Sequence, residues 1–221
     1  MAARAHAPLK IAESAANESG PISAIAKLAD LRAESEETAR LANLLGRSLY
    51  AAIALPMLGA STIALSAGTG WVRPLVWCAF VAAAAVTMLC SYVRTIRQPF
   101  ERSALKSFAQ DLSAILLYAG FAWGAGAFLV LPAGTAIAPA ILFAAAPGIA
   151  VAALLREREA VFLFLAPVAT LVSFASVLRP FASGALTAGL ILIVCAGVLG
   201  AAALRDRRSG DFVIPAMLPL T

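Results

Sequence analysis

Residues 112–155 contain no Asp, Glu, Lys, Arg or His. This uncharged run is about twice as long as the roughly 20 apolar residues that a helix needs to cross a hydrocarbon core. A soluble domain has charges at about a quarter of its positions, so it does not leave such a long segment without one. Because Pro132 and Gly134 divide the run, it predicts two consecutive membrane spans, 112–131 and 135–155.

The rest of the chain has the same character, with 62% apolar residues, 13% charged residues and a mean hydropathy of +0.89. Four further apolar segments predict spans at 48–72, 74–93, 160–178 and 181–204. These segments are continuous rather than alternating, and a helix satisfies its own backbone polar groups in lipid. The sequence therefore predicts an all-α membrane protein with six transmembrane helices arranged as three hairpins.

Two polar tails flank these spans. Residues 1–47 carry charges throughout and lack an early apolar core, so we expect no cleaved signal peptide. Pro21 after Gly20 is typical of a helix start, and the composition that follows predicts an N-terminal cytoplasmic helix leading into the first span. The predicted organisation is a cytoplasmic tail and helix (1–47), a transmembrane domain (48–204) and a short cytoplasmic tail (205–221).

The distribution of basic residues predicts the orientation of the spans. Of the 17 Lys and Arg residues, only Arg73 and Arg179 would lie in loops on the side opposite the N-terminus. Lys and Arg near span ends favour the cytoplasmic side of a membrane. We therefore expect a multi-pass protein of the bacterial inner membrane, embedded in the lipid bilayer with both termini in the cytoplasm.

A basic cluster follows the second predicted span and comprises Arg94, Arg97, Arg102 and Lys106. Such residues attract anionic lipid headgroups with about 1 kcal/mol for each charge near the surface. Apolar residues recur every four positions at Phe100, Ala104, Phe108 and Leu112. This spacing predicts an amphipathic segment that lies at the membrane interface before the third span. Trp71, Trp77 and Tyr92, near the ends of the second span, are expected in the interfacial aromatic belt.

Glycines and one proline are the candidate packing features of the spans. Gly120 and Gly124 form a GxxxG pattern followed by Gly126, and such small residues let another helix approach closely. The seam can serve a partner chain or packing within the bundle, and we favour the second interpretation. Pro147 and Gly148 are a candidate helix break; interrupted helices line transporter sites, although a proline more often only kinks a span.

Several chemistries are disfavoured by the residues present. His6 is the single histidine and lies in the polar tail, which excludes a bis-histidine haem between the spans of one chain. No predicted span has Asp or Glu at its middle, where proton and cation carriers are usually found. Walker, zinc, kinase and cyclase motifs are absent from the sequence. We expect no enzymatic activity, no catalytic residue, no cofactor, no metal and no nucleic-acid partner.

Four segments carry a resemblance to a known class: RLANLLGRSLYAAIALPMLGAS, SYVRTIRQPF, FAWGAGAFLVLP and LREREA. Through them, residues 40–204 resemble the six-span membrane input regions of bacterial sensor histidine kinases and diguanylate cyclases. The resemblance implies a sensory or regulatory module. Such regions feed a cytoplasmic output domain, and we expect this chain to lack one and to act through another membrane or cytoplasmic protein, or as a homodimer. Two alternatives remain, an accessory structural subunit of a larger membrane complex and a small-solute transporter.

Overall fold

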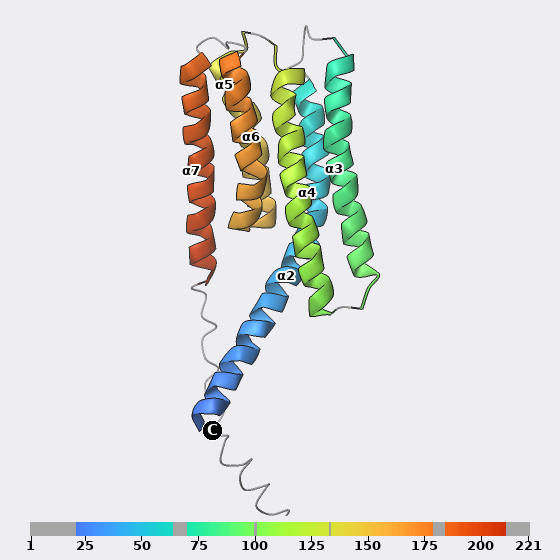
Figure 1. Cartoon of the computed structure of the whole chain (residues 1–221), viewed down its shortest axis with the longest axis vertical. Helices are drawn as coiled ribbons and strands as arrows, with labels where there is room; N and C mark the ends of the chain where they lie inside the picture. Colours follow the sequence, from blue (N-terminus) through green and yellow to red (C-terminus); the bar gives the residue numbers. More distant parts are fainter. Residues whose placement is uncertain (1–20, 64–69, 100, 133, 179–183, 211–221) are drawn as a thin grey trace, which may run out of the picture. The chain divides into compact units, whose positions relative to one another are not determined.

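A computed structural model describes residues 21–63, 70–99, 101–132, 134–178 and 184–210. Within these ranges the long elements are six helices, and no strand occurs among the described residues. In chain order they are α2 (Pro21–Thr62), α3 (Val72–Ile96), α4 (Arg102–Leu129), α5 (Ile137–Leu155), α6 (Arg158–Leu178) and α7 (Gly184–Gly210) (Figure 1). All six are long and apolar enough to cross a membrane. The predicted all-helical class and the six candidate spans are confirmed, and they support a multi-pass membrane protein.

By its internal contacts the chain divides into two units, Met1–Asn43 and Leu44–Thr221. In the first unit the described residues are helical, and every side chain from 25 to 36 is exposed. The second unit contains the helical bundle. The helix α2 has 42 residues and contributes to both units, so its own residues 44–62 belong with the bundle.

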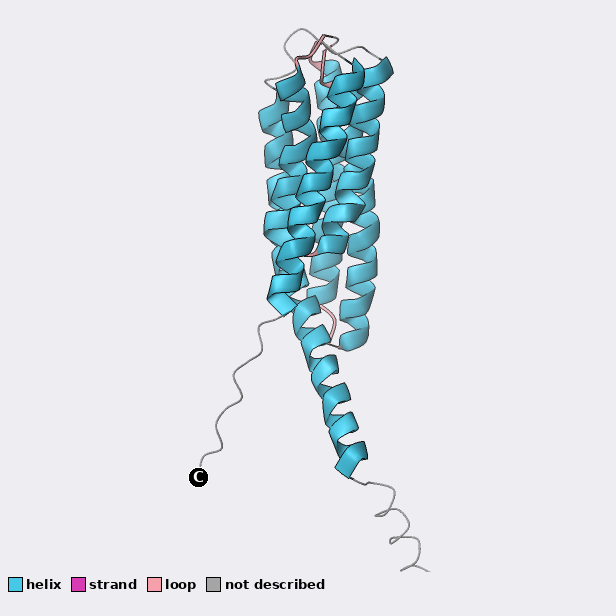
Figure 2. Ribbon diagram, turned by 90° about the vertical axis from the view of Figure 1, so that its left-hand side faces the viewer, coloured by secondary structure: helices cyan, strands magenta, loops and turns pink. Residues whose placement is uncertain are grey.

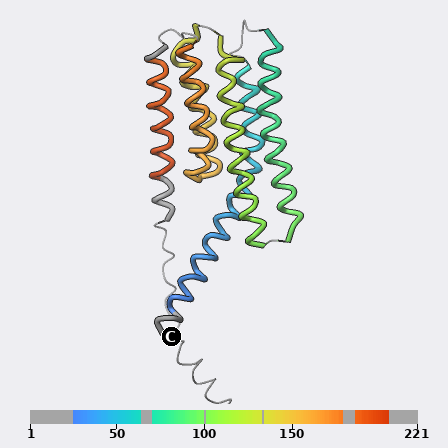
Figure 3. Tube along the Cα trace, in the orientation of Figure 1, coloured from blue at the N-terminus to red at the C-terminus, as the bar shows by residue number. Residues whose placement is uncertain are grey.

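The bundle is built around the neighbouring helices α4 and α6. Helix α4 packs against α3 on one side and α6 on the other, while α7 packs against α5 and α6. Successive helices of the bundle reverse direction, as the tube in Figure 3 shows, and they run side by side in the turned view of Figure 2. Short connections between consecutive helices favour such antiparallel neighbours. The bundle part of α2 reaches this core at Gly59, which lies beside Trp77, Val81 and Trp123.

The first connection corrects one predicted boundary. The first span was expected to extend to residue 72, but α2 ends at Thr62 and Val72 already begins α3. Just before α3, Gly70 has a φ of +76°, in the left-handed region that favours glycine because it has no Cβ. A helix cannot continue through that backbone conformation, so apolar composition alone placed the end of the span too late.

The segment before the third span also has a different environment from the one predicted. Residues from Arg102 onward are the first turns of α4 itself, and Phe108 and Leu112 are only 1% and 2% exposed. Their stripe therefore faces the bundle rather than the membrane interface; Phe100 lies outside the described residues. The reason is that α3 extends to Ile96 and packs along α4, which buries the apolar face that the spacing correctly identified.

The turn between α5 and α6 is very short. Arg156 ends α5 with a φ of +58°, and α6 begins at Arg158. A left-handed residue at the end of a helix reverses the chain within very few residues. This turn brings α5 and α6 into direct contact.

Candidate functional site

An aromatic cluster occupies the interior of the bundle. Trp77 of α3, Trp123 of α4 and Phe143 of α5 are each at most 1% exposed. The two indole rings meet edge to face with centroids 5.2 Å apart, and the Phe143 ring lies 5.8 Å from Trp77 and 5.6 Å from Trp123. Aromatic pairs at such separations are favourable beyond the area they bury. The cluster joins three helices that are separated in sequence.

The burial of Trp77 corrects its expected place in the interfacial belt. Trp71, which directly precedes α3, is 78% exposed, whereas Trp77 is completely buried. The difference follows from helical spacing, because Trp77 shares the inward face of α3 with Pro74, Val81 and Met88. That spacing was present in the sequence and was the signal that could have placed this tryptophan in the core.

Trp123 explains why α5 is not broken at Pro147. The helix runs without interruption from Ile137 to Leu155, so the candidate break at Pro147 and Gly148 is not present. Proline has no backbone N–H, and in a helix this removes the hydrogen bond to the carbonyl four residues earlier. That carbonyl belongs to Phe143, and Trp123 Nε1 donates to it at 2.9 Å. An indole from α4 thus replaces the missing donor of α5, as buried backbone groups in a membrane require.

Gly126 and Gly148 provide space for large neighbouring side chains. Trp77 Nε1 donates to the Ala122 carbonyl at 2.9 Å. A Cβ at Gly126 would lie 2.5 Å from that nitrogen and 2.7 Å from the Phe143 ring. A Cβ at Gly148 would lie 2.5 Å from a methyl carbon of Leu165. Both glycines therefore serve internal packing.

Gly120 and Gly124 line the contact between α4 and α6. A Cβ at Gly120 would overlap the Phe164 carbonyl oxygen and lie 2.6 Å from the Pro167 ring. A Cβ at Gly124 would lie 2.9 Å from Leu171 and 3.1 Å from the Pro167 carbonyl oxygen. The GxxxG pattern thus lets two helices of this chain approach closely. These contacts leave no room for a partner helix at the same positions.

Hydroxyl groups are the main polar side chains of the helical bundle. Ser113, Thr170 and Ser176 donate to carbonyls of their own helices. Among the described residues, the hydroxyls of Ser173 on α6 and Thr187 on α7 are buried without a hydrogen-bond partner. In the part of the chain that the structure describes, no group of three His, Cys, Asp or Glu side chains could hold a metal ion.

The four basic residues predicted to meet headgroups lie on two helices. Arg94 and Arg97 lie at the end of α3 and line a groove of about 580 Å³. Arg102 and Lys106 lie in the first turns of α4 and do not line it. The sequence showed all four residues to be basic. It did not show that only Arg94 and Arg97 line a common groove.

A second groove of about 680 Å³ lies between α6 and α7. Its walls are apolar and come from both helices, with Phe162 and Leu163 facing Leu199 and Ala203. Arg158 and Glu159 lie at its end. Sequence reasoning missed this groove because it depends on the spacing of two helices.

Comparison with protein-family models, with curated proteins and with solved structures found no match for this chain.

Proposed function

We propose that this chain is a non-enzymatic integral membrane module, sensory or regulatory, that acts through another protein. The observation that carries the proposal is an apolar stripe on the polar part of α2. Its members, Ile25, Leu28 and Leu31, are 66%, 67% and 58% exposed. At about 100° per residue they fall within an arc of about 120° that also holds Arg32, whereas Asp30 lies on the opposite side of the helix.

An exposed apolar stripe on a helix of this kind favours contact with another protein. The polar part of α2 is unsuited to the hydrocarbon core of a membrane, because charged residues recur through it from Lys27 to Arg40. The stripe is therefore a surface for a partner in the cytoplasm or for a second copy of this chain, rather than a lipid contact.

The length of α2 supports a regulatory role. It has 42 residues, which correspond to about 63 Å at about 1.5 Å per residue. About 20 residues suffice for the hydrocarbon core. The same helix therefore carries both the first candidate span and the apolar stripe, so a change in the bundle can reach the partner surface along one continuous element.

The orientation in this proposal places both termini in the cytoplasm of a bacterial cell. Reporter fusions at Gly70, Gly134 and Gly184 should therefore report the periplasmic side, and fusions at Gln98 and Thr221 the cytoplasmic side. The reason is the concentration of basic residues at one end of the spans. An inverted pattern, or one that requires an odd number of spans, would contradict the orientation.

The partner surface is tested by changing the apolar stripe alone. A variant with Ile25, Leu28 and Leu31 replaced by Ser should lose at least about tenfold in recovery of its partner, because it removes the apolar anchors. Recovery is measured by cross-linking in membranes followed by purification in mild detergent. Its matched control carries Ala26→Ser and Ala33→Ser on exposed positions of the other faces of the same helix.

Melting of each variant in detergent separates binding from folding. The bundle contains no residue of the stripe, so its thermal unfolding should not change. Equal recovery from the stripe variant and its control would contradict the proposal.

The second candidate function is an accessory structural subunit of a larger membrane complex. The face of α7 favours it, because a Cβ at Gly189, Gly197 or Gly200 would meet nothing within 4 Å. On the same helix Leu192 and Ile193 are 50% and 68% exposed. Such a surface allows another membrane helix to approach closely. Partner recovery that survives changes in the stripe but not Gly197→Leu would favour this candidate.

A further inference from the structure

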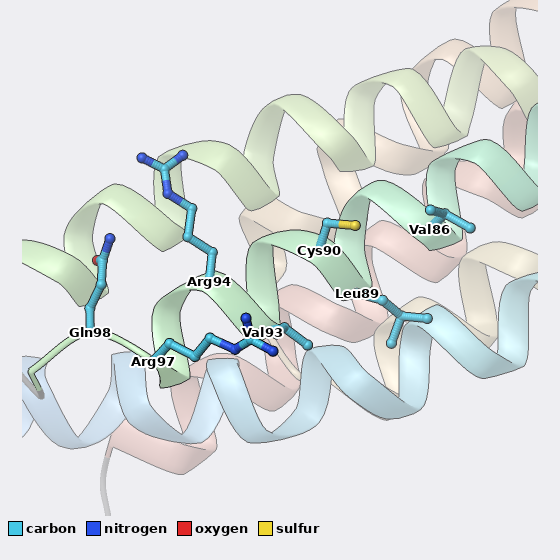
Figure 4. Close-up of a pocket in the computed structure, with 7 residues that line it drawn as sticks. All are labelled: Val86, Leu89, Cys90, Val93, Arg94, Arg97 and Gln98. Atoms are coloured by element: carbon cyan, nitrogen blue, oxygen red, sulfur yellow. The ribbon is translucent and has the colours of Figure 1, made fainter.

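One face of α3 combines an apolar surface with two arginines. The groove on this face is lined by Val86, Leu89, Cys90, Val93, Arg94, Arg97 and Gln98, which Figure 4 draws as sticks. Their spacing of three and four residues places them along a single side of the helix. From Val86 to Arg97 the face is about 17 Å long at about 1.5 Å per residue. The groove is thus apolar along the span and cationic at the helix end.

The arginines of this groove are available for an anion. Within the part of the chain that the structure describes, neither Arg94 nor Arg97 makes a hydrogen bond or ion pair through its side chain. No carboxylate lines the groove. Asp111 on α4 accepts a hydrogen bond from Ser91 at 3.5 Å and is not among the lining residues. The charge of the groove therefore comes from two guanidinium groups, and Gln98 adds an amide to its lining.

We propose that this groove binds one anionic phospholipid. Its phosphate is held by Arg94 and Arg97, and one acyl chain lies along Val86, Leu89 and Val93. Guanidinium groups match phosphate oxygens well, since each can donate two parallel hydrogen bonds. The apolar half of the groove selects a lipid over a soluble phosphate, because a free ion leaves these side chains uncovered. The proposal does not depend on the proposed function.

A discrete site differs from a general attraction of basic residues to headgroups. General attraction weakens by a similar amount for each charge removed near the membrane surface. A discrete site weakens only when a lining residue changes. Lys106 distinguishes the two cases, because it lies in the first turns of α4 outside the groove and carries the same charge.

The test measures lipid retention by native mass spectrometry of the full chain in detergent, with added phosphatidylglycerol or phosphatidylcholine. We expect preferential retention of one phosphatidylglycerol. R94Q and R97Q should each reduce its affinity roughly fivefold, and the double variant roughly 30-fold. K106Q should leave the preference unchanged, and an excess of inorganic phosphate should not displace the lipid. Equal losses in K106Q and R94Q, or displacement by phosphate alone, would overturn the proposal.

A second pair of variants tests the apolar half without changing charge. Cys90 is exposed and lines the groove, so C90F should fill it and reduce phosphatidylglycerol retention while both arginines remain. V76F is its control, because Val76 is 45% exposed on the same helix but does not line the groove. Thermal unfolding of both variants in detergent verifies that they fold. Undiminished retention by a folded C90F variant would also overturn the proposal.

Discussion

Replacing Gly120 with Leu should prevent stable assembly of the bundle. Even the first side-chain carbon would overlap the Phe164 carbonyl oxygen and lie 2.6 Å from the Pro167 ring. Backbone and a proline ring cannot rotate away as a flexible side chain does, so α4 and α6 must separate. Overpacking usually costs about 1–3 kcal/mol, and we expect about 3 kcal/mol or more here. The measurement is the free energy of unfolding in a denaturing-detergent titration, together with the yield of folded protein.

Substitutions at two other glycines should have smaller effects on stability. Gly124→Leu should also lower stability, but by less, because part of its contact is with the flexible end of Leu171. Gly197→Leu is the control, since a Cβ there meets nothing within 4 Å. If Gly120→Leu leaves the free energy of unfolding unchanged, α4 and α6 do not pack as described. Destabilisation by Gly197→Leu equal to that of Gly120→Leu would indicate a general effect of glycine replacement instead.

Replacing Trp123 with Phe should destabilise the bundle by about 1–3 kcal/mol. A smaller six-membered ring replaces the buried indole, and the Phe143 carbonyl loses the hydrogen bond that Trp123 Nε1 donates at 2.9 Å. Pro147 cannot supply a donor in its place. Trp71→Phe is the matched control, because Trp71 is 78% exposed and its loss should leave stability unchanged.

A double-mutant cycle with Pro147→Ala isolates the reason for this loss. Alanine restores a backbone N–H that can bond to the Phe143 carbonyl within α5. Trp123→Phe should then cost about 1 kcal/mol less than it does beside proline, which is measurable as a coupling energy from unfolding titrations. If the cost of Trp123→Phe is the same beside proline and alanine, the tryptophan stabilises the bundle by ring packing alone.

The contact at Gly120 and Gly124 shows which part of a helix–helix contact can be predicted from sequence. The pattern at Gly120 and Gly124 predicted a close helix approach, since only residue size is needed to see it. The partner surface, formed by Phe164, Pro167 and Leu171 of α6, depends on how the helices are arranged in space. For the same reason, Arg94 and Arg97 were recognisable as basic residues, but their shared groove with Val86 and Leu89 was not.

The helical class and the six candidate spans were determined by the sequence alone. Long uncharged runs such as 112–155 leave few alternatives, because a backbone in lipid must satisfy its own polar groups. Only the tertiary structure decided that Trp77 donates to a carbonyl of α4 and that α5 continues through Pro147. Both outcomes depend on donors, acceptors and space supplied by other helices, namely the Ala122 carbonyl and the Trp123 indole. Such groups are distant in sequence, so no local pattern around either residue contains them.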